Sequence, residues 1–167
     1  MSLDFGPAFR QPDQRSCGPA CLVVARMLRD PAYAAEAGPR FDAEVLATHR
    51  RVTGSRPAVG ALQLPWPRAL GTPPWAVARE LGRVTGARYA WPAVRWRSDS
   101  VRSRALAGLE AGLPVAVYVG SRWLPRHVLL AVTTTGGGLE LYDPARGHLT
   151  RTYGRWEVPW FVVAPLT

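Results

Sequence analysis

The sequence predicts an α+β fold in which helices come first and an antiparallel sheet follows. Up to Gly112, apolar residues recur at the spacing of amphipathic helices, with Asp, Ser, Thr or Pro before several of the segments. From Pro114 onward the period changes. Short runs of β-branched and aromatic residues alternate with turns that contain Gly or Pro, which is typical of strands.

The length of 167 residues predicts a single domain, spanning residues 1–167, with a sizeable core. We expect a helical lobe over about residues 1–112 and a sheet lobe over about 113–167. No apolar run is long enough to span a membrane, and Met1 to Phe9 lack the basic start and apolar block of a signal peptide. These features predict a cytoplasmic protein without a membrane span.

The helical half contains four segments with recognisable ends. Pro31 ends the first helix, Asp42 caps the second, and Thr72 precedes the prolines that start the third. The expected helices are residues 18–29, 43–49, 72–81 and 101–111. Residues 51–67 read as a loop, within a segment over residues 51–75 that is rich in Pro and Trp. Trp66 in this loop would either cover a groove or close over the core, and its frequency as a core residue favours the second reading.

The second half contains the candidate strands. A short strand is expected at residues 88–91, before the last helix, and Gly136 to Gly138 form a turn between two longer strands. The expected strands of the sheet are residues 114–119, 127–135, 139–142, 148–152 and 160–163.

The charge of the chain is strongly positive, at +9, and every basic residue is an arginine. A nucleic-acid-binding protein should concentrate such residues in one patch, whereas these are scattered between Arg10 and Arg155. We therefore expect no nucleic-acid partner. The alternative of a basic nucleic-acid binder predicts binding that weakens steeply with salt.

Cys17 lies where the first predicted helix begins. Ser16 or Cys17 occupies the cap position and Pro19 the first turn, so the unpaired N–H groups and the helix dipole favour a thiolate there. Cys21 is four residues further along the same helix face and is expected to pack into the core. Two cysteines at this spacing do not suit a disulfide. With three separated histidines they match no zinc spacing, so neither a metal nor a cofactor is expected.

His127 and Asp143 supply a candidate base and its orienting carboxylate. His127 opens an apolar strand after a polar loop, and Asp143 closes the next strand before Pro144. The two residues are equidistant from Thr135, so a hairpin brings them alongside each other, with a register error of one or two residues that a bulge would correct. The alternative is that Asp143 only starts a turn. His49, beside Arg50 and Arg51 at a helix end, is expected to be solvated.

These residues carry a resemblance. Gln11, the run Cys17-Gly18-Pro19-Ala20-Cys21, His127 and Asp143-Pro144 resemble the papain-like cysteine peptidases and, more narrowly, the bacteriocin-processing peptidases that remove double-glycine leaders. The resemblance implies a papain-like fold, with a helical lobe packed on an antiparallel sheet. It implies Gln11 as oxyanion donor, Cys17 as nucleophile, His127 as base and Asp143 as orienter. It also implies a peptide or protein substrate and association with an exporter or peptide-maturation system.

The resulting hypothesis is thiol-dependent hydrolysis of a peptide or amide bond. An acyltransferase or peptide-modifying enzyme on the same fold stays open, as does a peptide-binding module without catalysis. Gln14 is a rival to Gln11 as oxyanion donor. The arginines near the proposed site would favour acidic or carboxylate-bearing groups: Arg15, Arg122, Arg126 and Arg146.

Overall fold

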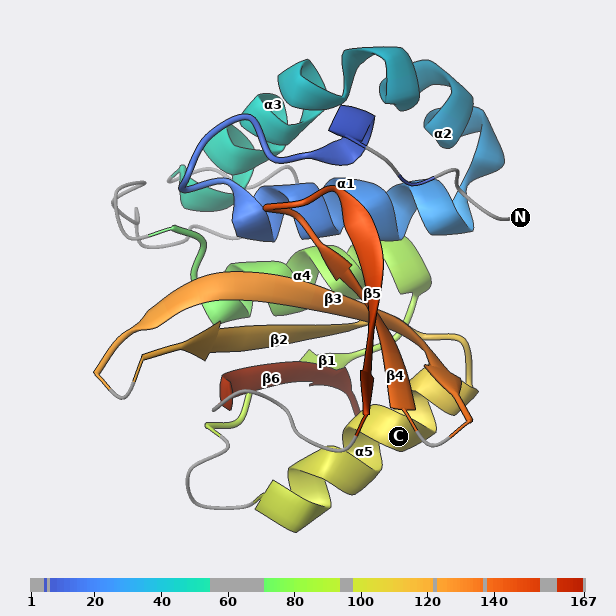
Figure 1. Ribbon diagram of the computed structural model, residues 1–167, viewed down its shortest axis with the longest axis vertical. Coiled ribbons are helices and arrows are strands. Elements are labelled where there is room, and N and C mark those ends of the chain that lie inside the picture. The colour runs from blue at the N-terminus through green and yellow to red at the C-terminus, as the bar shows by residue number, and fades with distance from the viewer. Residues whose placement is uncertain are drawn as a thin grey trace.

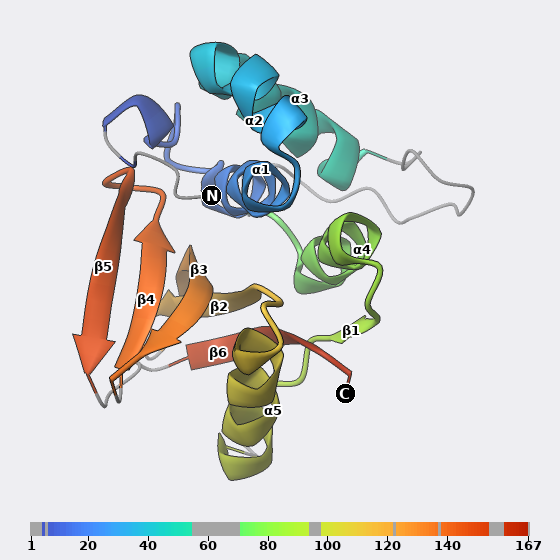
Figure 2. The same ribbon diagram turned by 90° about the vertical axis from the view of Figure 1, so that its right-hand side faces the viewer.

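The fold is a twisted antiparallel sheet with helices on both faces (Figures 1 and 2). The computed structural model describes residues 5, 7–54, 71–93, 98–121, 123–136, 138–153 and 159–166. The predicted loop at 51–67 therefore lies largely outside the described residues, and Trp66 with it. Among the described residues, no helix is long and apolar enough to cross a membrane.

The first face of the sheet carries a layer of helices. Helix α1 lies directly on the sheet, and α2, α3 and α4 pack around it (Figure 2). Pro31 and Pro74 start α2 and α4, where a missing N–H costs nothing. The elements of this layer are η1 (Pro7–Phe9), α1 (Cys17–Arg29), α2 (Pro31–Ala37), η2 (Gly38–Arg40), α3 (Phe41–Thr53) and α4 (Pro74–Thr85).

The sheet has the order β1-β6-β2-β3-β4-β5 within the described residues, and every pairing is antiparallel. The central strand β2 is buried along almost its whole length because both faces of the sheet are covered. The strands are β1 (Tyr89–Ala90), β2 (Val115–Gly120), β3 (Pro125–Thr135), β4 (Gly138–Asp143), β5 (His148–Tyr153) and β6 (Pro159–Pro165).

Two clusters of buried side chains fill the two faces. Ala116, Tyr118 and Leu130 point to the α1 face, whereas Val117 and Ala131 point to the other. This alternation follows from the two-residue period of a strand.

Helix α5 (Ser98–Glu110) covers the second face and packs on β6, β3 and β2. A Cβ atom at Gly108 would lie 2.5 Å from the Pro165 ring, so a glycine is required for this close contact. Thus α5 packs with the sheet, although the expected lobe boundary near residue 112 groups it with the other helices.

The β3–β4 hairpin sets the position of the two candidate catalytic residues on it. Its register shifts between Ala131 and Thr133, as the late position of the glycines suggested. Continuing the register from the Leu130–Tyr142 pair places Asp143 opposite Leu129. His127 is two residues from Leu129 and shares its side of the strand, so the slip of two residues keeps both side chains on one face.

The structure corrects the environment expected for His49. Helix α3 continues to Thr53, so His49 is an interior residue of the helix rather than its end, and it is 4% exposed. The expectation of a solvated histidine was wrong because Val52 and Thr53 continue the buried face of the helix beyond the two arginines.

Candidate active site

Cys17 is the first residue of α1 and is almost completely buried, at 6% exposed. Ser16 precedes it as the N-cap residue, and its hydroxyl donates to the Asp13 carbonyl rather than to the helix. The approach loop of residues 11–16 is thereby tied to the helix start. The first turn of α1 contains no acidic side chain. Its unpaired N–H groups therefore face Cys17 without a competing carboxylate in that turn.

Gly18 allows a second segment to approach the nucleophile. A Cβ atom at Gly18 would lie 2.8 Å from Thr72 Cβ and 2.9 Å from Thr72 Oγ1. The hydroxyl of the buried Tyr118 donates to the Thr72 carbonyl over 2.8 Å and fixes this segment to β2. The close approach of Thr72 thus explains why a glycine follows Cys17. This contact could not be read from the sequence because Thr72 is distant along the chain.

Burial controls the ionisation of Cys17. Loss of hydration raises the pKa of its thiol, and the charge of Asp13 adds to this. The backbone N–H groups of Val128, Gly18 and Cys17 act in the opposite direction, but they do not reverse it. The helix start therefore favours a thiolate as expected, yet burial outweighs it and raises the pKa of the Cys17 thiol.

Val128 holds both thiols against strand β3. Among the backbone groups that lower the pKa of Cys17, the Val128 N–H has the largest effect. The Val128 carbonyl accepts a hydrogen bond from the Cys21 S–H over 3.5 Å. Cys21 is fully buried, which confirms its expected place in the core. Because Val128 follows His127 directly, this contact brings the start of α1 next to the histidine along β3.

The histidine and the carboxylate are joined directly. His127 Nε2 lies 2.8 Å from Asp143 Oδ1, and the two side chains are 25% and 18% exposed. A neutral His127 that donates from Nε2 keeps the lone pair on Nδ1 as an acceptor. The hydrogen bonds of the described residues do not include one between Cys17 and His127.

The turn after β4 fixes Asp143 from the other side. The Ala145 N–H donates to Asp143 Oδ1 over 2.9 Å, and Arg146 Nε lies 3.6 Å from Asp143 Oδ2. The N–H groups of Arg146 and Gly147 donate to the Asp143 carbonyl. The turn expected from the Asp-Pro pair is present, and it orients the same carboxylate that His127 contacts.

Gln11 reaches this turn from the N-terminal loop. Its backbone N–H donates to the Pro144 carbonyl over 2.8 Å, so it lies beside the residue that follows Asp143. Its side-chain amide donates to the Asp13 carbonyl. A primary amide has two N–H donors, so one remains for a ligand. Gln14 is exposed.

The structure therefore assembles two pairs of the sequence-derived site residues: His127 with Asp143, and Gln11 with the turn that follows Asp143. Cys17 approaches them through Val128. His148 pairs with Asp143 in the β4–β5 register but its side chain is exposed, and Arg122 lies outside the described residues. No group of three His, Cys, Asp or Glu side chains in the described part of the chain could hold a metal ion.

Comparisons with known proteins match the fold. No protein-family model matches the sequence, and no curated protein matches it. Among the solved structures similar to the chain is the peptidase domain of Streptococcus ComA, a bifunctional ABC transporter involved in a quorum-sensing pathway. The similarity covers 94% of this chain and 96% of that one, with 17% identity and a TM-score of 0.50. The expected papain-like α+β fold, and the resemblance that suggested it, are thus confirmed at the level of the fold.

Proposed function

We propose that the protein is a cysteine peptidase that hydrolyses a peptide bond through Cys17, His127 and Asp143, with Gln11 as an oxyanion donor. The observation that supports this most directly is the 2.8 Å contact between His127 Nε2 and Asp143 Oδ1, next to the residue whose backbone contacts Cys17. A carboxylate on one ring nitrogen leaves the other free to take a proton.

The reaction starts from a protonated thiol. His127 Nδ1 takes the Cys17 proton as Sγ attacks the carbonyl carbon, and Asp143 stabilises the imidazolium that results. The Cys17 N–H and the free amide N–H of Gln11 stabilise the oxyanion. The imidazolium then protonates the leaving amine. Water, deprotonated by His127, finally cleaves the thioester.

The proposed substrate is a peptide, and the proposed partner is a peptide exporter or maturation system. ComA is a transporter with a peptidase domain, and the chain shares the fold of that domain across nearly its whole length. Co-purification of the protein with an exporter from its native membrane would support this partner, and a chain recovered alone under mild extraction would count against it.

Replacement of the two cysteines separates the nucleophile from its neighbour. We expect Cys17→Ala to abolish cleavage of a fluorogenic peptide library, with circular dichroism and thermal unfolding close to those of the parent protein. Cys21→Ala should keep cleavage but lose stability, since it leaves a small cavity in the core. Equal loss of cleavage in the two variants at equal folded fraction would contradict the role of Cys17.

A peptide-binding module without catalysis is the second candidate, and one observation favours it: Cys17 is only 6% exposed, and this burial raises the pKa of its thiol. Iodoacetamide labelling resolved by mass spectrometry distinguishes the two. If the protein is a peptidase, a bound peptide with a non-cleavable bond should slow the labelling of Cys17. The labelling rate should also depend on pH, and His127→Ala should remove that dependence. Slow labelling of Cys17 that is insensitive to His127→Ala would support the binding module.

A further inference from the structure

The approach loop before Cys17 and the last turns of α3 enclose a small pocket. It has a volume of about 180 Å³ and is lined by Asp13, Arg15, Leu46, His49 and Arg50. A water molecule occupies about 30 Å³ in the liquid, so the pocket has room for one side chain of moderate size. Arg15 is two residues from Cys17, and Asp13 is near enough for its charge to raise the pKa of the thiol. The pocket therefore lies where a peptide bound at Cys17 can place a side chain a few residues from the bond that is cleaved.

The charge of the lining is positive. Arg15 and Arg50 contribute two guanidinium groups against the one carboxylate of Asp13. One oxygen of that carboxylate already accepts the Arg15 backbone N–H over 2.7 Å. Leu46 adds an apolar surface suited to the methylene groups of a longer side chain. A carboxylate that entered the pocket would find two strong donors.

The arginines around the site differ from several others in the chain in whether they form ion pairs. Arg10, Arg15, Arg50 and Arg126 are exposed and adjacent to site residues or in the pocket, and no ion pair joins them to a carboxylate within the described ranges. By contrast, four other arginines form ion pairs with glutamates, two of them with the same Glu80: Arg40, Arg51, Arg83 and Arg151. Arg146 contacts Asp143 but keeps 72% of its side chain exposed.

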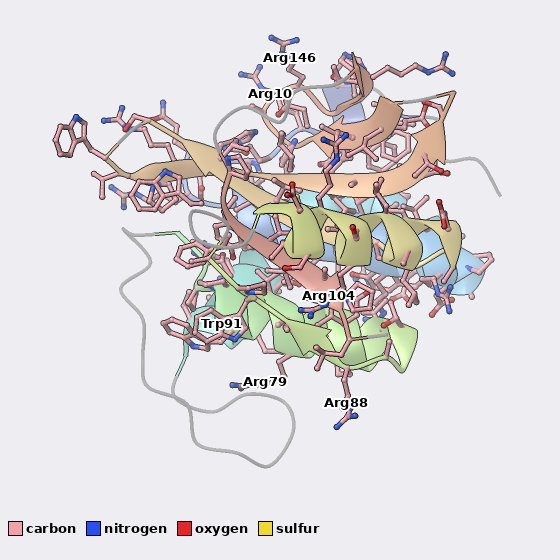
Figure 3. All side chains as sticks on the ribbon, turned by 90° about the horizontal axis from the view of Figure 1, so that it is seen from below. Arg10, Arg79, Arg88, Trp91, Arg104 and Arg146 are labelled. Carbon is pink, nitrogen blue, oxygen red and sulfur yellow. The ribbon has the colours of Figure 1, made fainter. Side chains whose placement is uncertain are left out.

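Two of the arginines near the site, Arg10 and Arg146, lie at one edge of the molecule. In Figure 3, Arg10 and Arg146 project from the same edge, whereas Arg79 and Arg88 project from the opposite edge and Arg104 lies between. Arg10 and Arg146 are thus exposed and lie apart from Arg88 and Arg104. This separation provides a matched control with the same change in net charge.

We propose that the protein selects a peptide with an Asp or Glu side chain a few residues from the bond presented to Cys17, and that Arg15 and Arg50 bind this carboxylate in the pocket. The inference rests on the proposed function, since it names the substrate class of the same site. Guanidinium groups suit carboxylates because their planar donors match two oxygens at once. The remaining cations, such as Arg126 and Arg146, increase the rate of encounter with an acidic peptide.

The test measures binding without turnover. A dye-labelled decapeptide library, with one position fixed as Glu or as its neutral isostere Gln, is titrated against the full-length Cys17→Ala protein by fluorescence anisotropy. At one library position or two adjacent ones, we expect the Glu peptides to bind roughly five- to tenfold more tightly than the Gln peptides. The preference should shrink as salt increases.

Paired variants locate the effect. Arg15→Gln with Arg50→Gln, in the Cys17→Ala background, should remove the preference for Glu, and Arg15→Lys with Arg50→Lys should restore part of it. Arg88→Gln with Arg104→Gln changes the net charge equally and should leave the preference intact. Circular dichroism of each variant identifies any that fails to fold, in which case the two single Arg→Gln variants are compared instead.

Three results would overturn the inference: equal binding of Glu and Gln peptides at every position, equal loss of preference in the Arg88/Arg104 control, or tighter binding of a single-stranded DNA decamer than of the best Glu peptides. Cleavage by the parent protein is scored separately. Cleavage without a preference for Glu would support the proposed function and contradict this inference. A preference for Glu without cleavage of any peptide would support this inference and contradict the proposed function.

Discussion

The two halves of the candidate site are built on opposite physical principles. Cys17 is dry, contacted by backbone donors and close to neutral partners such as Tyr118, so burial opposes its ionisation. His127 and Asp143 are partly open to water and belong to a chain of charged and hydrogen-bonded groups that ends at Arg146. The thiol half excludes water, and the hairpin half carries the charge. In the proposed mechanism, the thiolate therefore forms by proton transfer to His127 on the hairpin rather than through the helix start alone.

The largest expected effect comes from the charged half. Asp143→Asn keeps the shape of the side chain but removes the charge that would stabilise an imidazolium. We expect kcat/KM on a cleaved peptide to fall by about 10²- to 10⁴-fold. The Ala145 N–H can still donate to the amide oxygen, so the fold should be kept. A variant with parental kcat/KM would show that the thiol half ionises without help.

Gln11→Ala tests the link between the halves. Losing one oxyanion donor costs about 3 to 4 kcal/mol of transition-state stabilisation, so kcat should fall by about 10²- to 10³-fold. Gln14→Ala is the matched control, because Gln14 is exposed in the same loop and is the rival donor. If kcat falls only in Gln14→Ala, the roles of the two glutamines are the reverse of those proposed.

The packing of the thiol half can be broken at Gly18. In Gly18→Ala, the new methyl group would lie under 3 Å from Thr72, and overpacking of this kind costs about 1 to 3 kcal/mol. Urea unfolding should show that loss, and Gly18→Ala with Thr72→Gly, which removes the Cβ and Oγ1 atoms in close contact, should recover part of it. Gly86→Ala is a control for lost backbone freedom, since nothing lies within 4 Å of a Cβ there and the expected cost comes from its positive φ alone.

The smallest effect concerns alkaline stability. Burial raises the pKa of Tyr118 and Cys21 well above their usual values, and burial with the Glu44 hydrogen bond raises the pKa of Tyr33 to about 12. Such groups lose protons first in the unfolded chain, so the free energy of unfolding should fall as pH rises through 9 to 12. In Tyr118→Phe the decline should be shallower, after a loss of about 1 kcal/mol at pH 7 from the hydrogen bond to Thr72. Equal slopes for the two proteins would contradict the assignment.

Local patterns predicted most elements of the fold, whereas distant contacts decided what the sequence missed. The helix beginning at Cys17 and the strands flanking the glycine turn follow from spacing and end signals that act over a few residues. The burial of His49 depends on neighbouring elements that pack on α3, so local polarity was misleading there. Residues 31–37 form a helix although no helix was expected there, because Asp30 caps Tyr33 and the helix packs on α1.

The candidate site shows the same division. The residue types and their order along the chain were sufficient to select Cys17, His127 and Asp143 as a group. Their roles remain predictions, but the structure places His127 Nε2 within 2.8 Å of Asp143 Oδ1. The contributions of Thr72, Val128 and Ala145 could not be foreseen, because a backbone carbonyl or N–H has no signature in the side-chain sequence.

The bond from Cys21 to Val128 spans 107 positions of the chain, and this separation has a consequence for biosynthesis. A ribosome adds about 5 to 20 residues per second, so Cys21 emerges roughly 5 to 20 s before strand β3 can cover it. During that interval both thiols are exposed to oxidants and electrophiles that the finished protein excludes. Nascent chains released before residue 128 should therefore be alkylated at both cysteines, whereas the completed protein protects Cys21.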